Sequence, residues 1–134
     1  SPEDKELSKE IKKINVAYVK LVAPTNDEAF IKEALKKCSS WVYLVSYSGL
    51  TGSKQVNLGN VKKISKLIRK NSKIPIGVGF GIRTKSDVSK VIKIAEAAIV
   101  GSGIVDIIEK RGKNHNLTKK IGSYLKNLKK GLNK

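Results

Sequence analysis

Three short apolar runs in this chain are followed by glycine, and each leads into a helical pattern. The runs occupy residues 41–45, 76–79 and 97–100. Continuous apolar runs of this length are typical of parallel strands that are buried on both faces. Glycine at the end of such a strand lets backbone N–H groups approach an anion closely. The sequence therefore predicts a phosphate site assembled from three loops, the first of which contains Gly49 and Gly52.

The elements that must position these loops alternate along the chain. A period of three to four residues predicts helices, and a short apolar run predicts a strand. The expected order is helix 3–13, strand 16–23, a helix that ends near residue 38, strand 41–45, helix 61–70, strand 76–79, a helix after Thr84, strand 97–100, short helix 102–109 and helix 117–132. Residues 46–58 are expected to form a loop. Strict alternation with crossover helices predicts a parallel sheet with right-handed connections.

Capping residues mark several of the expected helix starts. Thr25 or Asn26 is the candidate cap of the second helix, and Asn60 is the candidate cap of the third. Thr84, three residues before Asp87, matches a capping box. The second helix is expected to place these residues on one face: Phe30, Ile31, Ala34, Leu35 and Cys38.

In parallel α/β sheets the ligand binds at the carboxyl ends of the strands, where these glycines lie. The last two glycine turns and the short helix 102–109 fit the phosphate site of (β/α)8 barrels, which lies between the final two strand loops and the N-terminus of an extra helix. A reading of the glycines as tight strand–helix turns alone is the competing interpretation.

The charge balance is strongly basic, with a formal net charge of +17 over 134 residues. This charge keeps a nucleic-acid-binding module open as an alternative. Nearly all the cations are Lys rather than Arg, and they follow the polar faces of successive helices without interleaved aromatic residues. Because Arg and aromatic platforms dominate nucleic-acid recognition, a solvated surface is the favoured interpretation.

Other features exclude whole classes of protein. No apolar run approaches the roughly 20 residues that span a membrane, and no signal peptide is visible.

Cys38 is the only cysteine, so a reducing cytoplasm and a packing role are expected. His115 lies in a polar stretch and is expected to be solvated. No residue pattern predicts a metal site. The chain contains no Met, which fits a processed, trimmed or partial chain.

Four stretches resemble the carboxyl-terminal half of the tryptophan synthase alpha subunit, a (β/α)8 barrel. They are Leu21-Val-Ala-Pro-Thr25, Tyr43-Leu-Val-Ser-Tyr-Ser-Gly-Leu-Thr-Gly52, Val78-Gly-Phe-Gly-Ile82 and Val100-Gly-Ser-Gly-Ile-Val105. The second is highly specific, whereas the glycine turns alone occur in many phosphate-binding barrels. The resemblance runs from about residue 1 to residue 132, and it implies one partial domain over residues 1–134 that lacks the barrel's amino-terminal half. The fold class it implies is α/β, a partial (β/α)8 TIM barrel with the last three to four βα units.

The resemblance implies a lyase of tryptophan biosynthesis that cleaves indole-3-glycerol phosphate to indole and glyceraldehyde 3-phosphate. Indole would pass to a beta subunit that carries pyridoxal phosphate, while this chain would hold no cofactor. The phosphate would bind mainly to backbone N–H groups at these residues, with Phe80 beside them: Gly52, Gly81, Gly101 and Ser102. Tyr43 would line the indole pocket, and Thr51 would help to close the site.

Two positions depart from the family: Tyr47 stands where many members have Arg, and Arg83 where many have Ser. The family's catalytic Glu and Asp belong to the amino-terminal half, and no segment here matches them. We assign no catalytic residue, since every acidic residue considered reads as a charge at a helix end or on a helix surface, and the chain alone is expected to be inactive. The alternatives are another phosphate-binding barrel enzyme or the basic binding module.

A half barrel is also expected to leave two sheet edges without partners, at strands 16–23 and 97–100. Open edges and an uncovered inner face favour association. The isolated chain is therefore expected either to self-associate through these edges or to be loosely packed.

Overall fold

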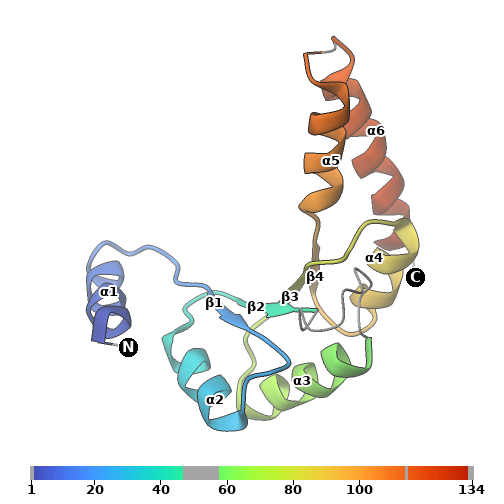
Figure 1. Ribbon diagram of the computed structural model, residues 1–134. Helices are drawn as coiled ribbons and strands as arrows, with labels where there is room; N and C mark the ends of the chain where they lie inside the picture. The colour runs from blue at the N-terminus through green and yellow to red at the C-terminus, as the bar shows by residue number, and fades with distance from the viewer. Residues whose placement is uncertain (1, 47–57, 114, 133–134) are drawn as a thin grey trace.

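The computed structural model describes residues 2–46, 58–113 and 115–132. The described elements alternate as the sequence predicts and are drawn in Figure 1. Their bounds are α1 Pro2–Lys13, β1 Lys20–Val22, α2 Glu28–Lys37, β2 Val42–Val45, α3 Leu58–Asn71, β3 Ile76–Gly79, α4 Lys85–Ile92, β4 Ala97–Ile99, α5 Ser102–Arg111, α6 Leu117–Lys129 and a 3-10 turn, η1, Lys130–Leu132.

The four strands form one parallel sheet in the order β1-β2-β3-β4. The register pairs Tyr43 with Gly77, and Gly79 with Ile99. Each connection between neighbouring strands contains a helix, as a parallel pair requires. The sheet is open, so β1 and β4 are its edges among the described residues. This arrangement is a partial (β/α)8 barrel, which confirms the predicted fold class.

The core lies between one face of the sheet and the helices α2, α3 and α4. Alternate strand residues point into it because successive side chains of a strand face opposite ways. Its fully buried side chains include Val22, Ile31, Val42, Leu44, Val61, Ile68, Ile76, Val78 and Val91. Leu21, which is 56% exposed, lies on the opposite face of the sheet. This face would line the inside of a barrel.

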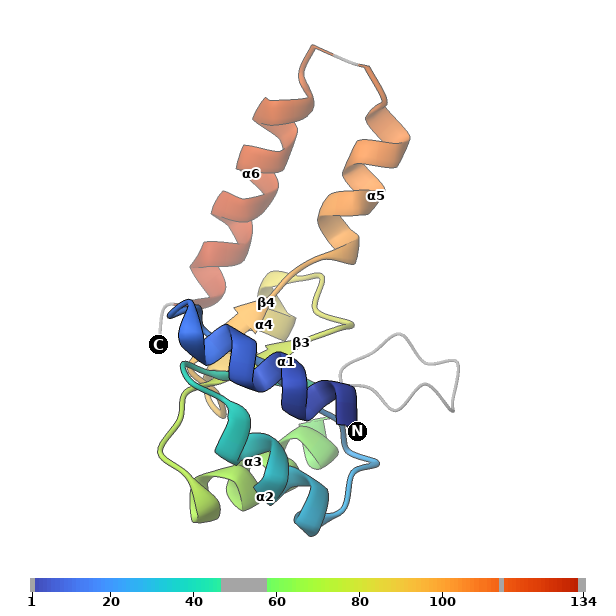
Figure 2. The same cartoon turned by 90° about the vertical axis from the view of Figure 1, so that its left-hand side faces the viewer.

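Helices α5 and α6 lie side by side and project away from the sheet in both views (Figures 1 and 2). The chain then returns to α4 through η1, where Gly131 is buried. A Cβ at Gly131 would lie 2.4 Å from the carbonyl oxygen of Lys85, so only glycine permits this close approach. This contact anchors the end of the hairpin beside the β3–α4 connection.

Strand β1 is shorter than the predicted strand 16–23. Asn15 has a positive φ of 55°, and the Tyr18 N–H donates to the Ser39 Oγ at 2.7 Å rather than to a strand backbone. The predicted strand is therefore confirmed only over Lys20–Val22. The apolar run could not show where a neighbouring strand would be available for pairing.

Two of the three cap predictions were wrong in position. Asp27, not Thr25 or Asn26, caps α2 by accepting the Phe30 N–H at 2.8 Å, while Asn26 accepts from the Ala23 N–H. Asn60 lies inside α3, which begins at Leu58. The capping box of Thr84 and Asp87 is confirmed. Phe30 is 48% exposed and thus does not share the buried face of α2.

Candidate functional site

The turn that follows β3 has an unusual backbone. Phe80 and Gly81 have φ values of 69° and 74°, and a positive φ costs a non-glycine residue about 1–3 kcal/mol. Ser46, fully buried at the end of β2, holds this turn in place. Its Oγ is 2.8 Å from the Gly79 carbonyl oxygen and also contacts that of Phe80. Phe80 itself is 53% exposed.

Tyr43 stands on the sheet face that the helices leave uncovered, beside this turn. Its ring centroid is 5.9 Å from that of Phe80 and 5.9 Å from that of Trp41. The glycines of β3 make room for two aromatic rings, that of Tyr43 in β2 and that of Trp41 directly before β2. A Cβ at Gly79 would lie 1.9 Å from the Tyr43 Oη, and one at Gly77 would lie 2.7 Å from Trp41. Burial raises the pKa of the Tyr43 phenol, so it remains neutral and offers an O–H donor at neutral pH.

The second half of the candidate site is the N-terminus of α5. Gly101 is the cap residue, has no side chain to satisfy the first-turn N–H groups, and is exposed together with Ser102. The first turn of α5 contains no acidic residue. A Cβ at Gly101 would meet no described atom within 4 Å. This end therefore presents backbone donors and the positive end of the helix dipole without an internal anion.

The sheet register brings the turn and the helix end together. Gly79 pairs with Ile99. Gly81 and Gly101 each come two residues after these paired positions, so both lie beyond the carboxyl ends of neighbouring strands. Two residues assigned to the site, Thr51 and Gly52, lie outside the described residues, as does most of the loop 46–58.

Arg83 joins the two halves in a way that the sequence did not reveal. Its Nη1 is 2.5 Å from the Asp106 Oδ2 on α5. Its carbonyl oxygen accepts the Tyr124 O–H of α6 at 2.6 Å, and its N–H donates to Asp87 of α4 at 3.0 Å. Asp106 raises the pKa of the Arg83 guanidinium. Ser46, Arg83 and Asp106 were missed as site residues. Of these three residues, only Arg83 stands out in the sequence, because it departs from the family pattern.

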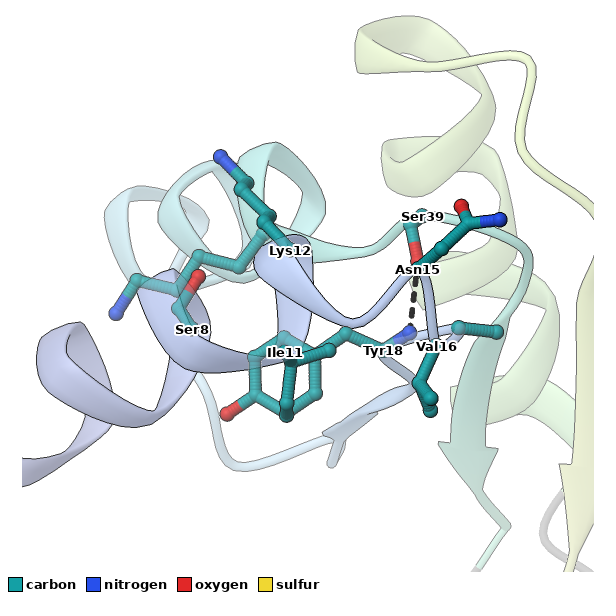
Figure 3. A pocket seen from close by; sticks show the side chains of 9 residues that line it. Ser8, Ile11, Lys12, Asn15, Val16, Tyr18 and Ser39 are labelled. Atoms are coloured by element: carbon teal, nitrogen blue, oxygen red, sulfur yellow. Dashed lines mark hydrogen bonds between the residues drawn. The ribbon is translucent and has the colours of Figure 1, made fainter.

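A hollow of about 330 Å³ lies elsewhere, between α1 and the segment that leads into β1 (Figure 3). Its lining residues include Ile11, Val16 and Ser39. Residues 16 and 39 precede β1 and β2, which puts this hollow at the amino ends of the strands. In (β/α)8 barrels, that end serves stability rather than ligand binding.

The other side chains that could take part in chemistry are those of Cys38 and His115. The Cys38 Sγ accepts the Lys20 N–H at 3.3 Å, and burial raises the pKa of its thiol, which opposes a nucleophilic role. His115 is exposed. Within the ranges that the structure describes, no three His, Cys, Asp or Glu side chains gather as metal ligands, and no helix is long and apolar enough to cross a membrane.

The sequence profile described as "Tryptophan synthase alpha chain" matches residues 1–133. The chain belongs to the tryptophan synthase alpha chain family. Relatives with that name include those of Caulobacter vibrioides, 40% identical over 86% of this chain, and of Methanocaldococcus jannaschii, 46% identical over 74%. These alignments cover 42% and 35% of the relatives' lengths, so this chain spans less than half of either.

Solved structures show the same partial correspondence. The tryptophan synthase alpha subunit of Campylobacter jejuni is 34% identical, with a TM-score of 0.75 over 90% of this chain and 48% of its own. A structure from Aquifex aeolicus has a TM-score of 0.83 and 27% identity, over 99% and 47% of the two chains. The family resemblance predicted from the four motifs is thereby confirmed, and it extends over the fold of the whole described chain.

Proposed function

We propose that this member of the tryptophan synthase alpha chain family supplies the phosphate-binding half of a site that cleaves indole-3-glycerol phosphate to indole and glyceraldehyde 3-phosphate. The observation that carries the proposal is the pairing of β3 with β4. This pairing brings the Gly81 turn and the N-terminus of α5, which has no side-chain cap, to the carboxyl end of the sheet. Donors in this arrangement suit a phosphate dianion without a neighbouring cation.

In this proposal the residues of the site divide into three roles. Gly52, Gly81, Gly101 and Ser102 bind the phosphate, mainly through backbone N–H groups. Tyr43 lines the pocket for the indole ring, and Phe80 lies beside the phosphate-binding residues, with its ring centroid 5.9 Å from that of Tyr43. Thr51 helps to close the loop over the substrate.

The acid–base chemistry lies outside this chain in the proposal. The family's Glu and Asp belong to the barrel's amino-terminal half, and the chain alone is inactive. The product indole would go to a beta subunit whose pyridoxal phosphate performs the next step. This chain would need no cofactor of its own.

A complementation assay tests the proposal. The chain is mixed with a separately expressed amino-terminal half of a tryptophan synthase alpha subunit, and indole release from indole-3-glycerol phosphate is followed. We expect activity in the mixture and none from either half. Gly101→Leu should abolish it by filling the space beside the phosphate. Gly122→Leu is the matched control, because a Cβ there also meets no described atom within 4 Å.

Three results would contradict the proposal. Indole release by this chain alone would place the acid–base pair within it. A folded and associated mixture with no activity would favour another phosphate-binding barrel. Ligand binding that falls steeply with salt would instead favour the nucleic-acid alternative, since polyanion binding releases counterions.

A further inference from the structure

The β3–α4 connection is tied to three helices through a single residue, Arg83. The side chain reaches α5 at Asp106, the carbonyl oxygen accepts from α6 at Tyr124, and the N–H donates to α4 at Asp87. Arg83 is only two residues beyond Gly81 and three beyond Phe80, the two residues with positive φ. The position of Arg83 therefore constrains the turn that carries half of the candidate phosphate site.

The partner of Arg83 belongs to the other half of that site. Asp106 lies one helical turn after Ser102 in α5, whose N-terminus forms the second set of donors. Tyr124 closes the same arrangement from α6: its Oη would lie 2.2 Å from a Cβ at Gly103, so this α6 side chain packs directly on the first turn of α5. The ion pair and the tyrosine thus fix the spacing between the Gly81 turn and the α5 N-terminus.

We propose that Arg83 and Asp106 are a positioning pair that sets the distance between the two halves of the phosphate site. The inference rests on the proposed function, which assigns phosphate to the Gly81 turn and the α5 N-terminus. Because the guanidinium is engaged by Asp106, Arg83 acts on the phosphate through the backbone that it holds. It does not act as the ligand itself.

The pair is a poor candidate for a purely stabilising interaction. Its side chains are 35% and 40% exposed, and ion pairs with such exposure add little to stability. The chain offers a matched pair for comparison. Arg69 and Glu96 are 2.7 Å apart with side chains 43% and 45% exposed, and Glu96 also accepts the N–H of Ile76 at the start of β3. That second pair lies at the amino end of the strands, away from the site.

The test measures binding of glycerol 3-phosphate to the full chain by NMR titration, following the backbone amides of Gly81 and Ser102. We expect Asp106→Asn and Arg83→Ser each to weaken binding about fivefold to tenfold, and the double variant to lose no more than either single one, because coupled residues are not additive. Arg69→Ser should change thermal stability by a similar amount and leave phosphate affinity unchanged.

Four results would overturn the pair's role. Tighter binding with a steeper salt dependence in Asp106→Asn would show that a released Arg83 is a direct ligand. Equal loss in Arg69→Ser would show a general stability effect. Unchanged affinity in both site variants would show that the pair has no role, while the proposed function would stand. Failure of the unsubstituted chain to bind the ester would overturn both.

Discussion

At the scale of single residues, the glycines of this chain have two separate roles. Those inside β3 make room for aromatic rings, since side chains at 77 or 79 would collide with Trp41 or Tyr43. Gly81 instead adopts a left-handed conformation, and Gly101 has open space beside it. Because no packing contact requires glycine at position 101, the open space there leaves room for a ligand to approach the backbone.

This difference predicts opposite outcomes for the same substitution. Gly79→Ala should destabilise the fold by about 1–3 kcal/mol, because the new methyl group overlaps the Tyr43 ring and the ring must move. Gly101→Ala should change stability by less than about 0.5 kcal/mol, as at most surface positions. Urea denaturation of the two variants makes the comparison. A larger loss for Gly101→Ala would show that Gly101 is required by the fold.

The sequence could predict the turn glycines but not their supports. A strand that ends in glycine is a local pattern, so Gly81 and Gly101 were recognised as turn positions. Ser46 and Asp106 act across sequence separations of 33 and 23 residues on Gly79 and Arg83. Nothing local distinguishes them from an ordinary polar residue at the end of a strand or on a helix surface.

At the scale of elements, α1 is attached to the sheet chiefly by polar contacts. Leu7 on this amphipathic helix is 52% exposed, and Ile14 directly after the helix is 68% exposed. The carboxylate of Asp4 accepts from the Tyr18 O–H at 2.5 Å and the Lys20 ammonium at 2.9 Å, and it also pairs with Lys37. Lys37, then Tyr18 and Lys20, hold the pKa of Asp4 well below its usual range.

The attachment of α1 should therefore depend on pH. The folded pKa of Asp4 is lowered, so its contribution is complete above the unfolded value of about 3.9 and is lost as the pH falls through the lower folded value. We expect amide-exchange protection of α1 at pH 6 to be lower in Asp4→Asn than in the unsubstituted chain, and the difference to shrink steadily as the pH falls below the unfolded pKa of about 3.9. Glu10→Gln, which removes an exposed pair with Lys13, should resemble the unsubstituted chain. A constant difference at every pH would contradict the assignment to this carboxylate.

Element types were predictable along the described chain, whereas several boundaries were not. The apolar periods identified the helices and strands, and the Thr84 box marked the start of α4. The start of α2 was missed because Thr25, Asn26 and Asp27 are all acceptable caps, and only the fold decides which one meets a free N–H. Asn26 is instead used in the turn at Ala23.

At the scale of the whole molecule, the open sheet dominates. Among the described residues β1 and β4 have strand partners on one side only. Leu21, which is 56% exposed, lies on the uncovered face of the sheet, and Phe80, which is 53% exposed, lies in the turn after β3. In a closed barrel such positions are covered by layers of side chains from the remaining strands. The relatives, more than twice as long as the matched segment, contain the additional chain that such closure needs.

The isolated chain should therefore self-associate through this face and its edges. Sedimentation velocity should show a weight-average mass that rises with concentration. Leu21→Lys, which adds a charge at the uncovered face, should shift the chain towards monomer. Phe30→Lys is the matched control, since Phe30 is 48% exposed on α2, outside this face. Equal effects of both variants would show association through exposed apolar residues in general.

Salt provides an independent test of the same association. With a formal net charge of +17, two copies repel at low ionic strength, and screening over a Debye length of about 8–10 Å removes much of that repulsion. Association driven by apolar burial should consequently strengthen between low and moderate salt. Adding the amino-terminal half should compete with it, because both occupants would cover the same sheet face. A compact monomer at every concentration and salt level would contradict the association. Association that persists unchanged in the presence of the amino-terminal half would place it on another surface.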